Sequence, residues 1–291
     1  GETQTTYVWF DALPNYWTAQ FFPGSKASWP ASVHVIGKDI TRFHTVIWPA
    51  MLMAAGLPLP ERVWAHGFIS LGGERFSKSA GVKLELREAA ERFGADAFRY
   101  YLLRDVPFDG DGSFSWERFE AVYTAELANG LGNLASRTIA MVEKYCEGVV
   151  PAGAFGATDA ADAADLAAAR AAVDGSQGYL LHEALDAIFR TVTRANLAIQ
   201  ESKPWVLAKD PAQRPELERV LAALMRQLAR QAVYLAPVMP GKAQALWEAL
   251  GGPGSVHEIS FAQAELLDCG GWHVAKGEGL FPRPEPPKPA S

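Results

Sequence analysis

The sequence predicts a mixed fold, with an open parallel α/β sheet in its first third and helices alone in the rest. Two observations support this. Strand-like runs alternate with helix-compatible stretches up to about residue 105, and long segments with helical periodicity follow. A length of 291 residues with 49% hydrophobic content is enough for two hydrophobic cores. We therefore expect two domains.

Three segments of the first part are rich in β-branched and aromatic residues, as strands are. They are residues 6–11 (TYVWFD), 32–37 (SVHVIG) and 62–71 (RVWAHGFISL). Each is followed by polar residues and then by a helix-compatible run. Ligands of open parallel sheets bind outside the carboxyl ends of the strands, so Asp11, Asp39 and the loop around Lys78 are expected to face one crevice.

The second part is predicted to consist of long helices. Apolar residues recur with helical spacing in residues 116–146, about 166–201, 215–235 and 242–250. Residues 153–165 (GAFGATDAADAAD) are small, acidic and weakly periodic, so we expect a connection between helices there. The proline-rich residues 281–291 (FPRPEPPKPAS) are expected to form a flexible tail.

Composition limits the classes of function. A net charge of −6 argues against a protein that coats nucleic acid electrostatically, so any nucleic-acid site must be local. Cys146 and Cys269 lie far apart without CxxC spacing, which predicts neither a disulfide framework nor a metal site. No segment has transmembrane length, and no secretory leader is visible. These features favour a cytoplasmic protein without membrane contact.

Residues 71–79 (LGGERFSKS) place a glycine turn before a polar loop. Lys78, between Ser77 and Ser79, offers a mobile cation together with hydroxyl and backbone donors, which are groups that bind phosphates. The pattern is not a Walker loop, because GxxxxGK[ST] is absent. From these residues alone a solvated surface loop is the favoured interpretation, and a phosphate-binding loop is the alternative.

The surrounding segments favour the alternative. RFSKS at Arg75–Ser79 resembles the KMSKS signature of class I aminoacyl-tRNA synthetases, and five segments resemble the methionyl-tRNA synthetases in the same order. They are residues 7–16 (YVWFDALPNY), 35–52 (VIGKDITRFHTVIWPAML), 64–79 (WAHGFISLGGERFSKS), 129–137 (NGLGNLASR) and 201–210 (ESKPWVLAKD). Ordered matches along almost the whole chain are specific, whereas many class I enzymes share the loop.

The resemblance implies a domain plan and a reaction. Residues 1–105 correspond to the C-terminal part of a Rossmann-like catalytic domain. Residues 106–280 correspond to an α-helical bundle that binds the anticodon, with 106–120 bridging the two. The implied enzyme is a methionine–tRNA ligase of protein biosynthesis. It uses ATP with Mg²⁺ to convert L-methionine to methionyl-adenylate, and it then transfers the aminoacyl group to methionine tRNA.

By the resemblance, the KMSKS-like loop meets the charge that develops when the methionine carboxylate attacks the α-phosphate of ATP. Lys78 contacts the phosphates, while Ser77 and Ser79 shape the loop. Loss of one such electrostatic stabiliser costs about 3 to 4 kcal/mol. Arg75 replaces the first lysine of the signature, which keeps the charge but substitutes a planar fork for a point cation.

The resemblance also implies two small-molecule subsites. Residues beside ATP and the adenylate are Gly37, Asp39, His66, Gly67 and Lys78, of which Asp39 accepts hydrogen bonds from the ribose. Methionine needs an apolar pocket, because its thioether is only a weak acceptor. The matching positions are Trp9, Ala12, Leu13, Tyr16, Ile40 and His44. Without the resemblance, core packing is the favoured interpretation of Trp9 and Ile40.

The expected anticodon site lies in the helical part. Asn133 and Arg137 are spaced i, i+4 and so share one helix face, from which an amide and a guanidinium can read base edges. Trp205 can stack on an unpaired base. The resemblance assigns all three to the cytosine at the first anticodon position. Taken singly, each has a structural alternative: a helix cap, an ion pair and a buried tryptophan.

Some family features do not occur in the chain. It contains no HIGH-type motif and none of the zinc-binding cysteines of the family's connective region. We therefore expect a fragment that is inactive alone and monomeric. Two alternatives stay open: a class I synthetase for leucine, isoleucine or valine, and a non-catalytic RNA-binding module derived from a synthetase.

Overall fold

The computed structural model describes residues 5, 7–71, 74–75, 86–175, 178–277 and 279–282. The chain folds as two compact units. Unit 1 comprises residues 1–69 and 109–112, and unit 2 comprises residues 70–108 and 113–291. The first boundary between the units thus falls at residue 69, and a short later segment, residues 109–112, also belongs to unit 1. The mixed α/β and all-α fold class is confirmed.

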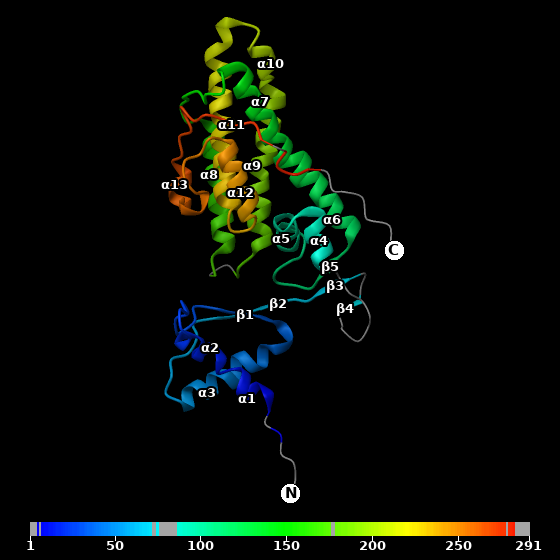
Figure 1. Ribbon diagram of the computed structural model, residues 1–291, viewed down its shortest axis with the longest axis vertical. Helices are drawn as coiled ribbons and strands as arrows, with labels where there is room; N and C mark the ends of the chain where they lie inside the picture. Colours follow the sequence, from blue (N-terminus) through cyan, green and yellow to red (C-terminus); the bar gives the residue numbers. More distant parts are fainter. Residues whose placement is uncertain are drawn as a thin grey trace. The chain divides into compact units, whose positions relative to one another are not determined.

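Unit 1 consists of short helical segments and two parallel strands (Figure 1). Its helical segments are α1 (Val8–Ala12), α2 (Asn15–Thr18), the 3₁₀ turns η1 (Ala19–Phe21) and η2 (Lys38–Ile40), the π-helical η3 (Phe43–Ile47) and α3 (Trp48–Ala54). Strands β1 (His34–Gly37) and β2 (Val63–His66) pair in parallel, with Gly37 opposite His66. This pairing confirms the parallel arrangement expected for the second and third predicted strands.

The first predicted strand, residues 6–11, is wrong. Val8–Ala12 form α1, in which the Leu13 N–H donates to the Trp9 carbonyl at 3.1 Å. A strand must exchange backbone hydrogen bonds with a neighbour. None of the strands that the structure describes pairs with this segment. Its backbone groups are therefore satisfied within the helical turn, which overrides the β propensity of its side chains.

The third predicted strand is divided at Gly67. Strand β2 ends at His66, and β3 (Ile69–Leu71) belongs to a second sheet in the order β4-β3-β5, with β4 (Glu74–Arg75) and β5 (Gly112–Phe114). A Cβ atom at Gly67 would lie only 1.9 Å from the Gly110 carbonyl oxygen. Only glycine permits this close backbone approach, which accompanies the break between the strands.

The core of unit 1 is small and aromatic. Leu13, Trp48 and Leu52 are no more than 3% exposed, and partly buried tryptophans pack around them. The rings of Trp29 and Trp48 meet edge to face at 5.8 Å. Aromatic side chains contribute large buried areas, so few residues suffice for this core.

Unit 2 is helical apart from its strands near the start (Figure 1). Its helical segments are α4 (Leu86–Phe93), α5 (Ala95–Arg104), α6 (Trp116–Val122), the π-helical η4 (Tyr123–Gly132), α7 (Asn133–Cys146), α8 (Ala157–Val173), α9 (Leu181–Ser202), α10 (Pro204–Leu207), η5 (Pro211–Gln213), α11 (Arg214–Leu235), α12 (Pro240–Ala249), η6 (Val256–Glu258) and α13 (Phe261–Glu265). Helices α7, α8, α9 and α11 form a bundle, with α4–α6 at one end and α10 at the other.

Helix α11 is the central helix of this bundle, since every residue from Leu224 to Leu235 is buried. The helices predicted over 215–235 and 242–250 correspond to α11 and α12 within two residues. The helix predicted over 116–146 is continuous through α6, η4 and α7. Periodicity therefore located these elements correctly, because their apolar faces pack against one core.

The connection predicted over residues 153–165 is mostly helix. Helix α8 begins at Ala157, and the chain turns only after Val173, so α8 and α9 are separate helices. Alanine has the highest helix propensity, and the Gly156 N–H donates to Asp159 Oδ2 at 2.9 Å at the helix start. The acidic residues Asp159 and Asp162 are buried against arginines of other helices.

The first residues of the predicted flexible tail are packed. Phe281 is 7% exposed, and its ring centroid lies 6.1 Å from that of Tyr123. The Tyr123 hydroxyl donates to the Pro282 carbonyl at 2.5 Å. Burial of the apolar Phe281 side chain is favourable, so the start of this segment packs on the bundle although the segment is rich in proline. Residues 283–291 lie outside the described residues.

Candidate functional site

The carboxyl ends of β1 and β2 bring together the four described residues predicted to lie beside ATP and the adenylate. Gly37 ends β1 and His66 ends β2 in register, so Asp39 and Gly67 follow at the same edge. The Asp39 carboxylate is exposed there. The topology therefore places these residues at the edge where parallel sheets bind ligands.

The His66–Gly67 corner has a defined hydrogen-bond arrangement. His66 Nδ1 lies 2.8 Å from the Gly67 carbonyl oxygen. Because a carbonyl oxygen can only accept, Nδ1 carries the proton and donates. The absence of a side chain at Gly67 lets its backbone lie directly against Gly110, whose carbonyl oxygen would be 1.9 Å from a Cβ atom there.

Asp111 connects this corner to the turn after β1. Its Oδ1 accepts from the Phe68 N–H at 2.7 Å, and its Oδ2 accepts from Lys38 Nζ at 2.6 Å. The Lys38 ammonium also lies 5.2 Å from the centre of the Phe68 ring. The sequence-based prediction missed this contribution of residues 109–112, because Lys38 and Asp111 are separated by 73 positions and no local pattern links them.

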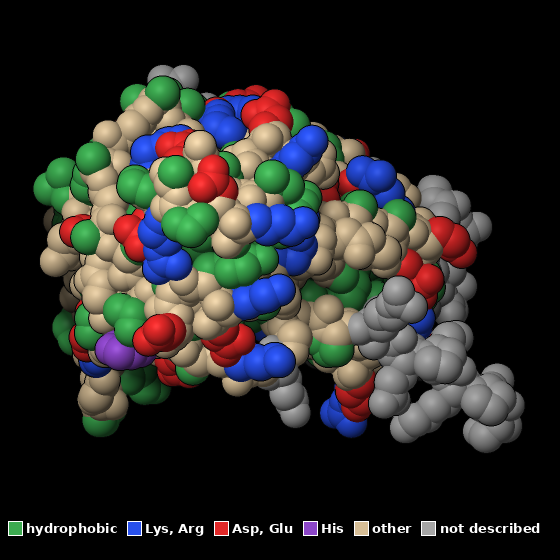
Figure 2. Space-filling view, turned by 90° about the horizontal axis from the view of Figure 1, so that it is seen from above, with side chains coloured by type: hydrophobic (Ala, Val, Ile, Leu, Met, Phe, Trp, Pro, Cys, Tyr) green, Lys and Arg blue, Asp and Glu red, His purple; other side chains and the backbone are tan. Residues whose placement is uncertain are grey.

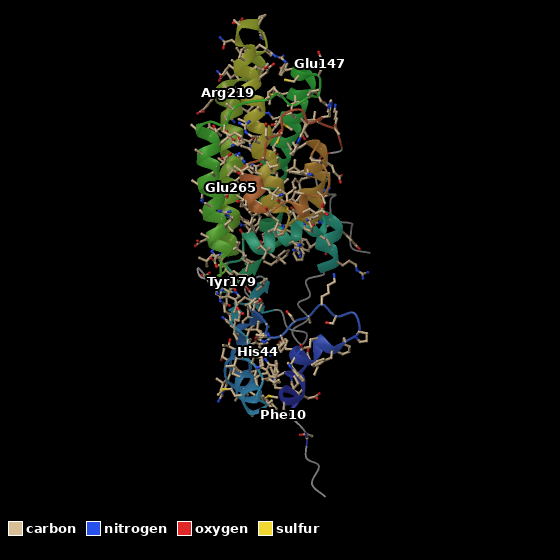
Figure 3. The ribbon with its side chains drawn as sticks, turned by 90° about the vertical axis from the view of Figure 1, so that its left-hand side faces the viewer. Phe10, His44, Glu147, Tyr179, Arg219 and Glu265 are labelled. Atoms are coloured by element: carbon tan, nitrogen blue, oxygen red, sulfur yellow. The ribbon has the colours of Figure 1, made fainter. Side chains whose placement is uncertain are left out.

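Tyr16 and His44 form the polar part of the predicted methionine subsite. His44 is fully buried, and its Nδ1 donates to the Ile40 carbonyl at 3.0 Å. Its Nε2 therefore accepts from the Tyr16 hydroxyl at 2.9 Å. Burial raises the pKa of Tyr16, so the phenol keeps its proton. Figure 3 labels His44 within unit 1 and the exposed Phe10 on the same unit.

Aromatic and aliphatic side chains surround this pair. The Trp9 ring stacks on Phe43 at 4.3 Å and meets His44 edge to face at 6.1 Å. Leu13 is 1% exposed, while Ala12 and Ile40 are half-buried. The six residues predicted for methionine thus come from two segments, α1–α2 and η2–η3, that pack together through these rings.

The sequence-based prediction missed His34, which belongs to the same aromatic group. Its ring lies 4.4 Å from that of Tyr16 and 5.9 Å from that of His44. His34 is buried, and its Nε2 has no hydrogen-bond partner in the part of the chain that the structure describes. Burial lowers the pKa of His34, and the neighbouring His44 lowers it further. The buried alternation of His34 and Ile36 in β1 was the available signal.

The KMSKS-like loop is described only at its first residue. Arg75 belongs to the two-residue strand β4, which pairs with β3. Ser77, Lys78 and Ser79 lie outside the described residues, so their roles stay predictions.

Asn133 and Arg137 lie on one face of α7, as the spacing predicted. Helix α7 continues directly from η4, so Asn133 caps no helix end. Asn133 is exposed and Arg137 half-buried. Neither side chain has a hydrogen bond or ion pair with the described part of the chain, so both are available to a ligand.

Trp205 is also exposed on unit 2. Asn196 Nδ2 in α9 donates to the Gly130 carbonyl at 3.3 Å, so α9 contacts the chain just before α7. Trp205 follows in α10 and is 42% exposed, so it is not a buried core tryptophan. Figure 2 shows Lys and Arg side chains interspersed with acidic and hydrophobic ones at this end of unit 2.

The described residues contain no group of three or more His, Cys, Asp or Glu side chains that could hold a metal ion. None of their helices is long and apolar enough to cross a membrane.

Comparison with known proteins gives consistent matches. Residues 1–139 match the family model described as tRNA synthetases class I (M). A methionine–tRNA ligase of Brucella melitensis is 44% identical over 97% of this chain and 55% of that protein. One of Streptomyces coelicolor is 43% identical over 98% of this chain and 55% of that protein. The chain thus spans about half the length of the curated relatives it matches.

A solved structure is also similar. It is the Mycobacterium tuberculosis methionyl-tRNA synthetase in complex with methionyl-adenylate, with a TM-score of 0.86 and 40% identity over 95% of this chain and 56% of that chain. The chain thus has the architecture of a class I aminoacyl-tRNA synthetase. Its parallel strands carry candidate ligand-binding residues at their carboxyl ends, and a helical bundle follows them. Within that class, the chain belongs to the methionyl-tRNA synthetase family.

Proposed function

We propose that this chain is part of a methionine–tRNA ligase. The enzyme activates L-methionine with ATP and Mg²⁺ to methionyl-adenylate and transfers the aminoacyl group to methionine tRNA, acting as a monomer in the cytoplasm. The observation that carries the proposal is the convergence of the predicted methionine-binding residues on the hydrogen-bonded pair Tyr16 and His44. The similarity to a synthetase bound to methionyl-adenylate supports the same reaction.

The proposed methionine subsite discriminates against polar side chains, because the protons of Tyr16 and His44 are already used in hydrogen bonds within the protein. The Tyr16 proton is donated to His44, and the His44 proton is donated to the Ile40 carbonyl. The remaining wall is aromatic and aliphatic, from Trp9 and Leu13. An amino-acid side chain that requires strong hydrogen bonds would lose them on entering, whereas a thioether loses little.

The adenylate subsite is proposed at the carboxyl ends of β1 and β2. Asp39 accepts from the ribose hydroxyls, and the adenine ring packs beside His66 and Gly67. Lys38 is already paired with Asp111. The positive charge that meets the phosphates is therefore assigned to Lys78, assisted by Arg75, with Ser77 and Ser79 shaping the loop. Gly37 starts the turn that presents Asp39.

The anticodon subsite is proposed on unit 2. The side chains of Asn133 and Arg137 read the edge of the cytosine at the first anticodon position, and exposed Trp205 stacks on its ring. The overall charge is negative, so this local combination of an amide, a cation and an aromatic ring provides the recognition.

Binding of adenylate analogues tests the proposed activity. Titration of the chain with a non-hydrolysable methionyl-adenylate analogue, followed by calorimetry, should give tighter binding than the leucyl analogue by about tenfold or more. Tyr16→Phe should weaken the methionyl analogue about tenfold, because the buried Nε2 of His44 loses its donor. Tyr7→Phe, at a tyrosine that is 58% exposed, is the matched control. Equal affinity for the two analogues would contradict the proposal.

Binding of tRNA tests the anticodon assignment. Methionine tRNA with cytosine at the first anticodon position should bind more tightly than the same tRNA with uracil there. Trp205→Ala should reduce the binding free energy by about 1 to 3 kcal/mol and abolish that difference. Val206→Ala, at the neighbouring residue that is 50% exposed, is the control. If both tRNAs bind equally to the unaltered chain, the roles given to Asn133, Arg137 and Trp205 are wrong.

A further inference from the structure

Unit 2 contains a cavity that the proposed function does not use. Its volume is about 360 Å³, and it lies between α5, α8, α9 and α11, near the residues that follow α11. None of the predicted anticodon residues lines it. Ligand cavities in proteins have volumes from about 300 Å³ upward, so this one has the size of a small-molecule site.

The wall of the cavity is apolar. Leu103 of α5, Val173 of α8 and Leu185 and Ile188 of α9 contribute aliphatic side chains. A dry apolar cavity of about 150 Å³ holds one benzene ring, so about 360 Å³ accommodates two fused rings. Water is a poor occupant, because it needs several polar partners.

Two features favour an aromatic occupant over an aliphatic one. Phe261 lines the cavity, and its ring stacks on that of Tyr234 with centroids 4.5 Å apart. Arg170 also lines it, and a guanidinium group stacks on aromatic faces even when its edge is ion-paired. Both groups interact more strongly with a π system than with a saturated ring.

The charge of the wall favours a neutral occupant. Arg170 is the charged residue among the described residues that line the cavity, and its Nη1 is 2.9 Å from Glu265 Oε1. Glu265 is labelled in Figure 3. The Arg170 and Glu265 side chains are 40% and 35% exposed, so their charges are paired with each other at the edge of the cavity. The other side chains of the lining are uncharged, and an ion among them would lack a partner of opposite charge.

We propose that this cavity is a binding site for a neutral molecule of two fused aromatic rings. The occupant fills the space between α5 and the bundle, beside the hydrogen bonds from Arg99 Nε to the Val238 carbonyl at 2.9 Å and from Arg99 Nη2 to the Pro237 carbonyl at 3.0 Å. Occupancy therefore adds contacts among four helices and stabilises unit 2.

Three probes of one size test the proposal on the unaltered chain: 2-naphthol, its saturated analogue decahydro-2-naphthol, and the anion 2-naphthoate. We expect 2-naphthol to bind saturably with one site and to raise the melting temperature with its concentration. The saturated and the anionic probes should each bind about three- to tenfold more weakly. Equal affinities of the three probes, or no saturable binding of 2-naphthol, would overturn the proposal.

Adjacent alanines of α8 locate the site. Ala169 lines the cavity, whereas Ala168 is exposed. Ala169→Leu should reduce 2-naphthol affinity at least tenfold by filling the space, and Ala168→Leu should leave it unchanged. Ala184→Leu fills the cavity from α9 and gives an independent test if Ala169→Leu fails to fold. Binding that persists in both filled variants would place the probe elsewhere and overturn the assignment.

Discussion

Unit 1 and unit 2 bury different kinds of polar group. In the described part of unit 1 the buried polar residues are His34 and His44, within an aromatic cluster. In unit 2 they include carboxylates and guanidinium groups, chiefly Asp159, Arg226 and Arg230. The unit proposed to receive an apolar amino acid thus has neutral polar groups inside, whereas the helical unit has ions that join its helices.

Asp159, Arg226 and Arg230 form one buried cluster of paired ions in unit 2. Arg226 contacts both carboxylate oxygens of Asp159 at 3.0 Å, and Arg230 Nη1 contacts Oδ1 at 3.0 Å. Arg226 also donates to the carbonyls of Gly153 and Ala154. These contacts tie the start of α8 to α11 in one register. A buried ion pair specifies such a register because any shift leaves charge unpaired, whereas ring contacts tolerate small shifts.

Removal of the shared carboxylate should have the largest effect. Asp159→Asn leaves Arg226 and Arg230, which are 1% and 3% exposed, without a counter-ion. We expect the free energy of unfolding to fall by about 3 to 5 kcal/mol. Urea denaturation followed by far-ultraviolet circular dichroism measures it. A loss below about 1 kcal/mol would show that backbone carbonyls alone stabilise the arginines.

Truncation of the unit 1 core should have a slightly smaller effect. Leu52→Ala removes a side chain that is 1% exposed between Leu13 and Trp48, which should cost about 2 to 4 kcal/mol. Hydrogen exchange of peptides that contain α1 and α3 should become faster. Met53→Ala, at the next residue and 69% exposed, is the control. Equal effects of the two variants would mean that this cluster is not the stabilising core.

Acidification should affect unit 1 before unit 2. Burial lowers the pKa of His34 below its ordinary 6.5, with a further contribution from His44, so the folded state favours the neutral ring. The contribution of the neutral His34 ring to the free energy of unfolding is fully present above pH 6.5. It is lost as the pH falls through the pKa that His34 has in the folded state. For one proton, the free energy of unfolding changes by at most about 1.4 kcal/mol per pH unit.

Asp159, the buried carboxylate of the ion cluster in unit 2, loses its charge at a lower pH than His34 gains its proton. Burial opposes the charge of Asp159, but hydrogen bonds from Arg226 and Gly156 and the charges of Arg226 and Arg230 outweigh it and lower the pKa below 3.8. Its contribution is therefore lost only as the pH falls below that value. Relative to the intrinsic exchange rate at each pH, the protection of unit 1 peptides against hydrogen exchange should fall between pH 7 and 5, and His34→Gln should remove this dependence. The same loss of protection in that variant would exclude His34 as its source.

An exposed ion pair on α11 should have the smallest effect. Arg219 and Glu216 are spaced i, i+3, and their side chains are 56% and 43% exposed (Figure 3 labels Arg219). We expect Glu216→Ala to change the free energy of unfolding by less than about 0.5 kcal/mol, and added salt to abolish the change. A larger, salt-independent loss would contradict the contrast with Asp159 on the same bundle.

Periodicity in the sequence predicted most of unit 2, because a long amphipathic helix depends on one continuous apolar face. It failed for residues 153–165, whose small, acidic and weakly periodic sequence predicted a connection between helices. Asp162 pairs with Arg194, which lies 32 positions away, and Asp159 pairs with Arg226, which lies 67 positions away. No local pattern reveals such partners. The alanine content of α8 was the available helix signal.

The candidate site was predictable where it depends on ordered motifs. The motif that contains Tyr16 and the motif that contains His44 lie far apart in sequence, and the structure shows that these two side chains meet. Neither His34 nor the Asp111 connection belonged to the predicted site. Both depend on contacts across the fold, between β1 and α2 and between η2 and residues 109–112.

The sequence by itself determined the family, the parallel pairing of β1 with β2 and the positions of α11 and α12. These follow from ordered motifs and from the spacing of apolar residues along one chain. Tertiary structure alone decided that residues 8–12 form a helix and that the acidic residues of α8 are buried. The physical reason is the same in both cases. A backbone group or a charge adopts the state in which it finds a partner, and those partners are set by the fold.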